Sequence, residues 1–188
     1  MAYQLEEINR RLKEDPAEFV AECDGVYQKR LETAADRILE RMKVSPIVLL
    51  SGPSGSGKTT TALKLEQELE RRGVQTHTIS MDNYFKTLNR RTAPRNAEGD
   101  IDYESPKLLD MDLLDETFTK LSRGEWVIVP KFEFARQMRN DSRGTPLKLD
   151  KNEIAIFEGI HALNDDIFGR HPEATGLYIS ARSNVLEG

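Results

Sequence analysis

The segment at residues 52–59, Gly-Pro-Ser-Gly-Ser-Gly-Lys-Thr, constrains the fold of this 188-residue chain more than any other part of the sequence. It matches the pattern G-x-x-x-x-G-K-[ST], in which glycines let the backbone curve so that successive N–H groups point at a phosphate. An apolar run at 47–50 precedes it and a helical stretch follows it. A strand, a glycine-rich loop and a helix in this order predict an α/β domain that binds nucleotide phosphates.

The side chains of this loop point to a triphosphate bound with Mg²⁺. The ammonium group of Lys58 can reach the terminal phosphates, and the hydroxyl of Thr59 can ligate the metal ion. The residues predicted to contact the nucleotide are Gly52, Ser54, Gly55, Ser56, Gly57, Lys58, Thr59 and Thr60. The guanine-binding pattern Asn-Lys-x-Asp does not occur in the sequence, and the Asp-x-x-Gly at 166–169 does not follow an apolar strand. We therefore expect ATP, not GTP, together with Mg²⁺.

From residue 45 onward, short apolar strands alternate with helical stretches. This alternation predicts a three-layer α/β fold of the P-loop NTPase type, with a mostly parallel sheet covered by helices on both faces. The expected strands are 47–51, 74–79, 126–130, 154–157 and 177–179, and the expected helices are 58–72 and 105–121. Residues 83–104 and 131–152 are expected to be long loops, and such loops in compact domains usually carry function.

Residues 1–44 differ from the rest and predict an N-terminal helical extension to a P-loop core at 45–188. Asp15 followed by Pro16 is a helix start signal, because it places a capping side chain before a proline in the first turn. Apolar side chains then recur at three- and four-residue spacing for about two dozen residues, after a shorter polar helix at 3–13. This stripe predicts either a cap over the main domain or a contact with a partner or a second copy of the chain.

Composition limits the partners and the compartment. The net charge is −5, from 27 basic and 32 acidic residues, so no overall basic field favours nucleic acid or an anionic membrane. The single cysteine, Cys23, cannot form an internal disulfide, and no cluster of Cys and His predicts a zinc site. The N-terminus has an acidic pair where a signal peptide would be basic and then apolar. These features predict a cytoplasmic protein with a small-molecule substrate.

Two acidic residues lie where parallel strands are expected to end. Asp82 follows the strand at 74–79, and Glu158 directly follows the strand at 154–157. Ligands of open parallel sheets bind beyond the carboxyl ends of the strands. One such carboxylate can hold Mg²⁺, and another can accept the proton of a hydroxyl group that attacks a γ-phosphoryl group. The sequence therefore predicts phosphoryl transfer with Asp82 and Glu158 in these roles.

Five ordered motifs together carry a family resemblance. They lie at residues 51–60, 80–85 (Ser-Met-Asp-Asn-Tyr-Phe), 102–106 (Asp-Tyr-Glu-Ser-Pro), 130–134 (Pro-Lys-Phe-Glu-Phe) and 156–161 (Ile-Phe-Glu-Gly-Ile-His). Over about residues 45–182 the chain resembles the uridine kinase (uridine–cytidine kinase) and phosphoribulokinase-like family of P-loop kinases. The resemblance implies transfer of the ATP γ-phosphate to a hydroxyl group, which in uridine kinases is the nucleoside 5′-hydroxyl.

The resemblance also implies roles for individual residues. Asp82 would be the catalytic base, Lys58 would act on the phosphates, and Glu158 and Thr59 would hold Mg²⁺. The residues implied on the substrate side are Asp82, Tyr84, Glu104, Phe132, Phe134, Gln137 and Arg139. Glu104 would accept a ribose hydroxyl, whereas Gln137 replaces a histidine that helps uridine kinases to read the pyrimidine. This difference affects base specificity more than it affects the reaction.

The resemblance leaves three functions open. Family members continue past the strand at 177–179 into an arginine-rich lid and further elements, whereas this chain stops at Gly188, which implies a shortened kinase without the lid. A nucleoside kinase is the first expectation. A kinase for another small hydroxyl metabolite, such as pantothenate or a sugar phosphate, is the second, and it would explain the arginines of the two long loops. A nucleotide-binding regulatory protein with weak catalysis is the third.

Overall fold

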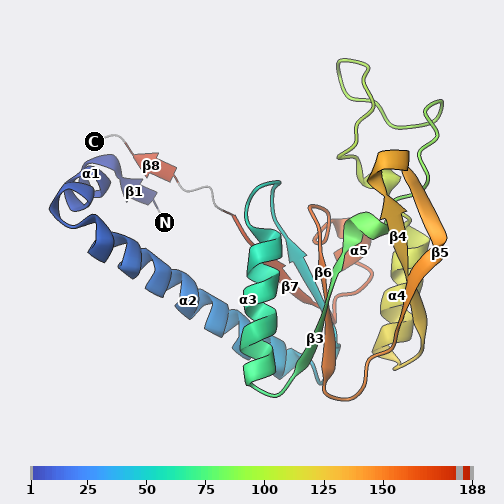
Figure 1. Cartoon of the computed structure of the whole chain (residues 1–188), viewed down its shortest axis with the longest axis horizontal. Helices are drawn as coiled ribbons and strands as arrows, with labels where there is room; N and C mark the ends of the chain where they lie inside the picture. The colour runs from blue at the N-terminus through green and yellow to red at the C-terminus, as the bar shows by residue number, and fades with distance from the viewer. Residues whose placement is uncertain (1, 181–183, 187–188) are drawn as a thin grey trace.

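A computed structural model of the chain describes residues 2–180 and 184–186, and its centre is a parallel sheet (Figure 1). The sheet has four strands in the order β3-β6-β2-β7. Their bounds are β2 Ile47–Ser51, β3 Gln75–Ser80, β6 Glu153–Glu158 and β7 Thr175–Tyr178. The expected parallel sheet is thus confirmed, with strand ends shifted by one or two residues. β2 and β6 are central and almost wholly buried, as continuous apolar runs require.

Helices cover both faces of this sheet, which confirms the three-layer architecture. α2 (Pro16–Arg41) and α3 (Lys58–Arg71) lie on one face, and α4 (Met111–Ser122) lies on the other with the short α5 (Asp165–Phe168). The side chains of β2 alternate between the two cores, because successive residues of a strand point to opposite faces. Ile47 and Leu49 pack with Phe118 of α4, whereas Val48 and Leu50 pack with α2 and α3.

A β-hairpin stands beside the sheet where the sequence predicted a sheet strand and a loop. β4 (Val127–Glu133) pairs antiparallel with β5 (Met138–Leu147), and the two form a sheet of their own. The expected strand at 126–130 is therefore not part of the parallel sheet, and the expected loop at 131–152 contains the end of β4 and all of β5. The polar composition of β5 concealed it, because a strand that buries little surface shows no apolar alternation. A 3₁₀ turn, η3 (Phe134–Arg136), connects the two strands.

The helix expected at 105–121 is shorter than predicted. Ser105 and Pro106 begin only a 3₁₀ turn, η2 (Pro106–Leu108), in which the Ser105 side chain accepts a hydrogen bond from the Lys107 amide. α4 starts later, at Met111, where the Asp110 carboxylate caps it by accepting from the Leu113 amide at 3.3 Å. Residues 83–104 form the expected long loop, which leaves the sheet through a further 3₁₀ turn, η1 (Met81–Tyr84).

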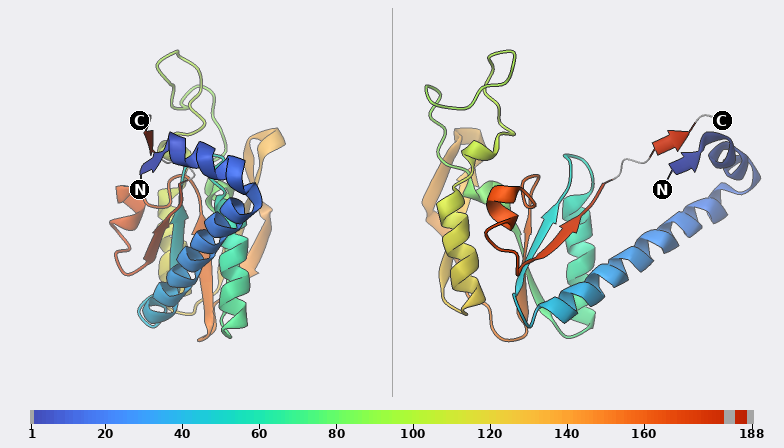
Figure 2. Two further views of the ribbon diagram at one scale, coloured as in Figure 1. Left: turned by 90° about the vertical axis from the view of Figure 1, so that its left-hand side faces the viewer. Right: turned by 180° about the vertical axis from the view of Figure 1, so that it is seen from behind.

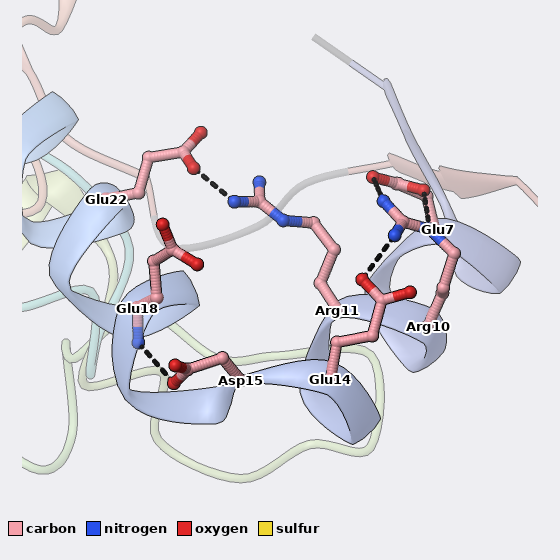
Figure 3. A network of polar contacts seen from close by, with 7 residues as sticks. All are labelled: Glu7, Arg10, Arg11, Glu14, Asp15, Glu18 and Glu22. Atoms are coloured by element: carbon pink, nitrogen blue, oxygen red, sulfur yellow. Dashed lines mark hydrogen bonds and ion pairs between the residues drawn. The ribbon is translucent and has the colours of Figure 1, made fainter.

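The two N-terminal helices form a corner that extends away from the sheet (Figure 2). α1 (Leu5–Glu14) is shorter at its start than expected, because β1 (Ala2–Gln4) pairs in parallel with β8 (Asn184–Leu186). Asp15 ends α1 and caps α2 by accepting from the Glu18 amide at 2.9 Å, and Arg11 reaches Glu22 across the corner (Figure 3). Such exposed ion pairs orient the helices but contribute little stability.

The half of α2 that begins at Tyr27 is the part packed against the core. Leu31, Ala35 and Ile38 are buried there, whereas Val20 and Val26 are 54% and 45% exposed. The expectation of a helical cap therefore holds for this half. Across residues 2–180 and 184–186, no helix combines the length and the apolar character that a membrane crossing requires.

Candidate active site

The phosphate-binding loop connects the end of β2 to the start of α3. Gly55 and Gly57 have φ angles of +71° and +86°, which glycine adopts at no steric cost. Gly52 is needed for a different reason, since a Cβ atom there would lie 2.3 Å from the backbone oxygen of Ile179. The Ile179 amide donates to the Ser51 oxygen at 2.8 Å, so β7 runs directly against the loop. This backbone matches the curve that a phosphate-binding loop requires.

Lys58 is the first residue of α3 and extends back over the loop. Its Nζ atom donates a hydrogen bond to the Pro53 carbonyl oxygen at 3.0 Å. The amide of Thr61 donates to the Gly57 oxygen at 2.9 Å, which begins the helix directly behind the loop. The positive end of α3 and the Lys58 ammonium group therefore favour an anion at the same place.

Asp82 and Glu158 approach this loop from neighbouring strands. Ser80 of β3 is in register with Glu158 of β6, and Glu158 is in register with Leu50 of β2. Three parallel strands therefore end at one level, with the loop and both carboxylates beyond them. Asp82 lies two residues beyond the end of β3, in the 3₁₀ turn η1. Its amide donates to the Ser80 hydroxyl at 3.3 Å.

Burial changes the proton affinity of both carboxylates. Desolvation raises the pKa of Asp82, and the charges of Lys58 and His161 partly oppose the rise. Desolvation also raises the pKa of Glu158, as does its neighbour Asp82, while Lys58 and a hydrogen bond from Ser80 lower it. Lys58 therefore acts on both carboxylates, so the three charged groups occupy one site. Raised pKa values of carboxylates in a cleft are typical of functional acids and bases.

A cleft of about 680 Å³ holds this site together with most of the residues predicted on the substrate side. The predicted residues that line it are Ser54, Gly55, Gly57, Lys58, Thr59, Thr60, Asp82, Glu104, Phe132, Phe134, Gln137 and Glu158. We call the part formed by the loop at 52–60, Asp82 and Glu158 the phosphate half. We call the part formed by Tyr103, Glu104, Phe132, Phe134 and Gln137 the acceptor half.

The acceptor half contains an aromatic wall and a polar bridge. The ring of Phe132 packs edge-on against Phe134, with centroids 5.1 Å apart, and against Phe85 at 5.6 Å. Gln137 has a φ angle of +51°, which is uncommon for a residue other than glycine, and its side-chain amide donates to the Tyr103 hydroxyl at 3.1 Å. An aromatic wall beside an amide held by a hydrogen bond is suited to a planar ring with polar edges.

Two of the predicted substrate residues are not brought into the cleft. Tyr84 is fully buried in the core, where its ring packs against Phe157 with centroids 6.1 Å apart, and burial raises its pKa to about 12. Arg139 lies on β5 beyond the cleft lining, and its guanidinium group pairs with the Asp110 carboxylate at 2.6 Å. Tyr84 therefore has a packing role in this structure, and Arg139 ties the hairpin to the start of α4.

The cleft also includes residues that the sequence analysis did not single out. Tyr103 directly precedes Glu104, and Lys86 and Leu88 belong to the long loop at 83–104. His161 is not part of the lining but lies next to it in the turn after β6, where its Nε2 atom donates to the Glu104 carbonyl oxygen at 2.6 Å. The only sequence signal for these residues was their place within or beside motifs already identified.

The donor groups of the phosphate half fit a Mg²⁺ ion that is bound together with a nucleotide. Among the described residues, no group of three or more His, Cys, Asp or Glu side chains could hold a metal ion. Mg²⁺ in kinases is usually held by one or two protein oxygens together with phosphates and waters, so such a cluster is not required. Thr59 and the Glu158 carboxylate both line the cleft at the loop and would be two protein oxygens available for this role.

The parallel sheet, the loop and the paired strand-end acids define the class of P-loop kinases. Residues 47–185 match the model of the Phosphoribulokinase / Uridine kinase family, and the chain belongs to this family. The resemblance expected from the five motifs is thereby confirmed.

Individual relatives support this assignment over part of their length. A uridine kinase of Schizosaccharomyces pombe is 35% identical over 117 residues, which are 62% of this chain and 25% of that protein. A uridine kinase of Staphylococcus aureus (strain JH9) is 32% identical over 126 residues, or 67% of this chain and 58% of that protein. The chain thus matches a quarter of one relative and just over half of the other.

A solved structure shows the same fold. A candidate fructose transport system kinase from Silicibacter sp. TM1040 superposes with a TM-score of 0.63 and 23% sequence identity. The superposition covers 79% of this chain and 73% of that one.

Proposed function

We propose that the protein transfers the γ-phosphoryl group of ATP to the 5′-hydroxyl of a nucleoside, uridine or cytidine first, with Mg²⁺ bound at the site. The observation that carries the proposal is the convergence of Lys58, Asp82 and Glu158 in the cleft that also contains the aromatic wall. Residues 45–188 would form the kinase core, and residues 1–44 a helical extension of it. Membership of the kinase family supports the reaction, and the acceptor half supports a planar acceptor.

Each group of the phosphate half would have one task. The amides of the loop and the Lys58 ammonium group bind the β- and γ-phosphates and stabilise the charge that develops in transfer. Thr59 and Glu158 would hold Mg²⁺, which would supply positive charge beside the phosphates. The Asp82 carboxylate accepts the proton of the acceptor hydroxyl as its oxygen forms a bond to the γ-phosphorus and the bond to ADP breaks. Its raised pKa favours this proton transfer.

The acceptor half would position the nucleoside for this step. The pyrimidine ring packs on Phe132 and Phe134, and Gln137 offers an amide to its polar edge. Glu104 accepts a hydrogen bond from a ribose hydroxyl, and its backbone is held to the turn after β6 by His161. Positioning two reactants in this way is a large part of phosphoryl-transfer catalysis.

The test is a coupled assay of ADP release with purified protein, ATP, Mg²⁺ and a panel of acceptors. Uridine and cytidine should accelerate ADP release, and purine nucleosides should do so less. The panel should also contain pantothenate and several sugar phosphates. Equal background rates with all nucleosides would contradict the nucleoside proposal, and binding of ATP without any acceptor-dependent turnover would favour a regulatory nucleotide-binding protein.

One observation favours a second candidate, a kinase for an anionic acceptor. Lys86 and Leu88 line both the main cleft and a neighbouring cavity of about 270 Å³, which Lys107 also borders. Two ammonium groups beside the acceptor half could hold a phosphate or carboxylate of the acceptor. In the acceptor panel this candidate predicts turnover with a sugar phosphate or pantothenate and none with uridine.

A further inference from the structure

A separate cavity of about 350 Å³ lies on the other side of the phosphate-binding loop, between α2, α3 and the end of β7. Ser56 and Thr61 border it from the loop and the first turn of α3. Their sequence neighbours Gly55, Gly57 and Thr60 border the main cleft. The two cavities therefore adjoin the same short segment from different directions.

The N-terminal helix α2 supplies one wall of this cavity. Tyr27, Arg30, Leu31 and Ala34 contribute to it. All four precede residue 47, where the match to the family model begins, so this wall lies outside the matched core. Because Leu31 is also buried in the core, the wall has a fixed position relative to the sheet.

Two contacts fix α2 to the start of α3. The hydroxyl groups of Tyr27 and Thr61 form a hydrogen bond at 2.9 Å, and the ammonium group of Lys64 lies 4.6 Å from the centre of the Tyr27 ring. Thr61 is also the residue whose amide bonds to the Gly57 oxygen of the loop. Through its side chain and its amide, Thr61 thus connects α2 with the backbone of the phosphate-binding loop.

The lining of the cavity is apolar and aromatic with a cation at its edge. Leu31, Ala34, Leu177 and Ile179 provide aliphatic surface, and Tyr27 and Tyr178 provide aromatic rings. The Tyr178 side chain is 66% exposed, so a large aromatic surface lies open beside the loop. Arg30 adds a planar guanidinium group, which stacks readily on aromatic rings. This combination is suited to a planar heteroaromatic ring.

We propose that this cavity binds the purine base of the nucleotide whose phosphates lie on the loop, so that α2 is part of the nucleotide site. The inference rests on the proposed function, because it needs a nucleotide on the loop. Thr60 borders the main cleft and its neighbour Thr61 borders this cavity, so a nucleotide with its phosphates on the loop would have its base, one ribose away, within reach of the cavity. The extension then determines nucleotide affinity in addition to covering the sheet.

The experiment compares two ligands that differ in the base. Calorimetry measures binding of ATP and of inorganic tripolyphosphate, both with Mg²⁺, to the wild-type chain and to Ala34→Leu. The added methyl groups occupy the cavity, so the affinity for ATP should fall about tenfold while that for tripolyphosphate changes less than about twofold. Ala17→Leu is the matched control, because it makes the same change on an exposed part of α2. It should bind both ligands like the wild type.

A second variant reports by its fluorescence whether the base of ATP enters the cavity. Tyr178→Trp in a Trp126→Phe background places the only tryptophan at the cavity, since the chain has a single tryptophan. ATP should quench its fluorescence, and tripolyphosphate should leave it nearly unchanged. The inference is overturned if Ala34→Leu keeps its ATP affinity, loses affinity for both ligands equally, or if ATP does not change the fluorescence. Wild-type protein that binds neither ligand would instead contradict the proposed function itself.

Discussion

The two halves of the cleft are built in different ways. The phosphate half lies at the level ends of three parallel strands, and its backbone is fixed by close contacts such as Gly52 against Ile179. The acceptor half is assembled from the long loop and the hairpin, and its side chains are more exposed, with Tyr103 at 52% and Phe134 at 60%. Burial explains why the pKa shifts of the cleft are found on Asp82 and Glu158, in the phosphate half.

This difference separates the reaction from the choice of acceptor. Groups that rigid strands hold in low-dielectric surroundings can stabilise transferring phosphate with little reorganisation. Side chains on loops can differ without disturbing that machinery. We therefore expect changes in the phosphate half to reduce turnover with every acceptor, and changes in the acceptor half to alter the KM for the acceptor alone.

The largest effect is expected for Asp82→Asn. Loss of the base should lower kcat about 100-fold to 10,000-fold, the usual contribution of general base catalysis. Binding of ATP, measured by calorimetry, should stay similar because the loop and Lys58 are intact. Unchanged turnover in the ADP-release assay would contradict this assignment of roles to the two halves, since Asp82 would then have no part in the reaction.

The same variant makes a prediction about stability and pH. Because burial raises the pKa of Asp82, the folded protein binds the proton more tightly than the unfolded chain does. The stability that depends on this group is thus greatest below the unfolded pKa of about 3.9 and decreases as pH rises through the folded pKa. Asp82→Asn should therefore raise the Tm near neutral pH and leave it unchanged in acid. Thermal unfolding at several pH values measures this, and a lower Tm near neutral pH would argue against a desolvated carboxylate.

Lys58→Met should have the next largest effect. It removes the cation proposed to bind the phosphates, and the methionine side chain fills the same space, so kcat should fall about 100-fold to 1,000-fold. Unlike Asp82→Asn, it should also weaken the binding of ATP. Lys148→Met, an exposed lysine between β5 and β6 that lines neither the cleft nor the cavity beside α2, is the matched control and should retain turnover. An equal loss of kcat in both variants would show that the net charge of the protein, and not the position of Lys58 at the loop, causes the effect.

Gly52→Ala tests the rigid backbone of the phosphate half. The added Cβ would lie 2.3 Å from the Ile179 oxygen, so the loop or β7 must move. We expect a loss of about 1–3 kcal/mol in the free energy of unfolding, measured by denaturant titration, together with reduced ATP binding. Gly25→Ala, where a Cβ meets no atom within 4 Å, is the control and should be neutral or stabilising. A stable Gly52→Ala variant would show that the close approach is not required.

The contrast between the halves also explains what the sequence could predict. The loop and the two strand-end acids follow from local patterns, because a strand buried on both faces is apolar and its end is marked by the first polar residues. Asp82 and Glu158 could therefore be placed at one edge before the sheet order was known. This placement required only that the strands be parallel, because the carboxyl ends of parallel strands lie at the same edge of a sheet.

The acceptor half could not be derived in the same way. β5 is polar along most of its length, so only its pairing with β4 reveals it as a strand. Tyr84 was placed in the cleft by its position in a motif, but the 3₁₀ turn at 81–84 directs Asp82 to the cleft and Tyr84 to the core. Tyr103 and Gln137 are 34 residues apart and meet only through tertiary folding.

Phe134→Ala tests the acceptor half. The residue is exposed, so its loss should not affect folding, but it removes an aromatic surface on which we expect the acceptor ring to pack. The KM for the accepted nucleoside should rise about tenfold, with the KM for ATP unchanged. Ile128→Ala, an exposed residue of the same hairpin, is the control. A rise in the KM for ATP as large as that for the acceptor would contradict the separation of the two halves.

The smallest effect is expected for Tyr103→Phe, which removes a single hydroxyl group. The Gln137 amide then loses the partner that holds it at 3.1 Å, and it must find water or turn away from the acceptor. The KM for the acceptor should rise about threefold, as the net value of one hydrogen bond implies, while kcat is nearly unchanged. If Gln137 contacts the base of the acceptor, Gln137→Leu should raise the KM for the acceptor by more than threefold. The double variant Tyr103→Phe/Gln137→Leu should then have the same KM as Gln137→Leu alone. Additive effects in the double variant would show instead that Tyr103 contacts the acceptor independently of Gln137.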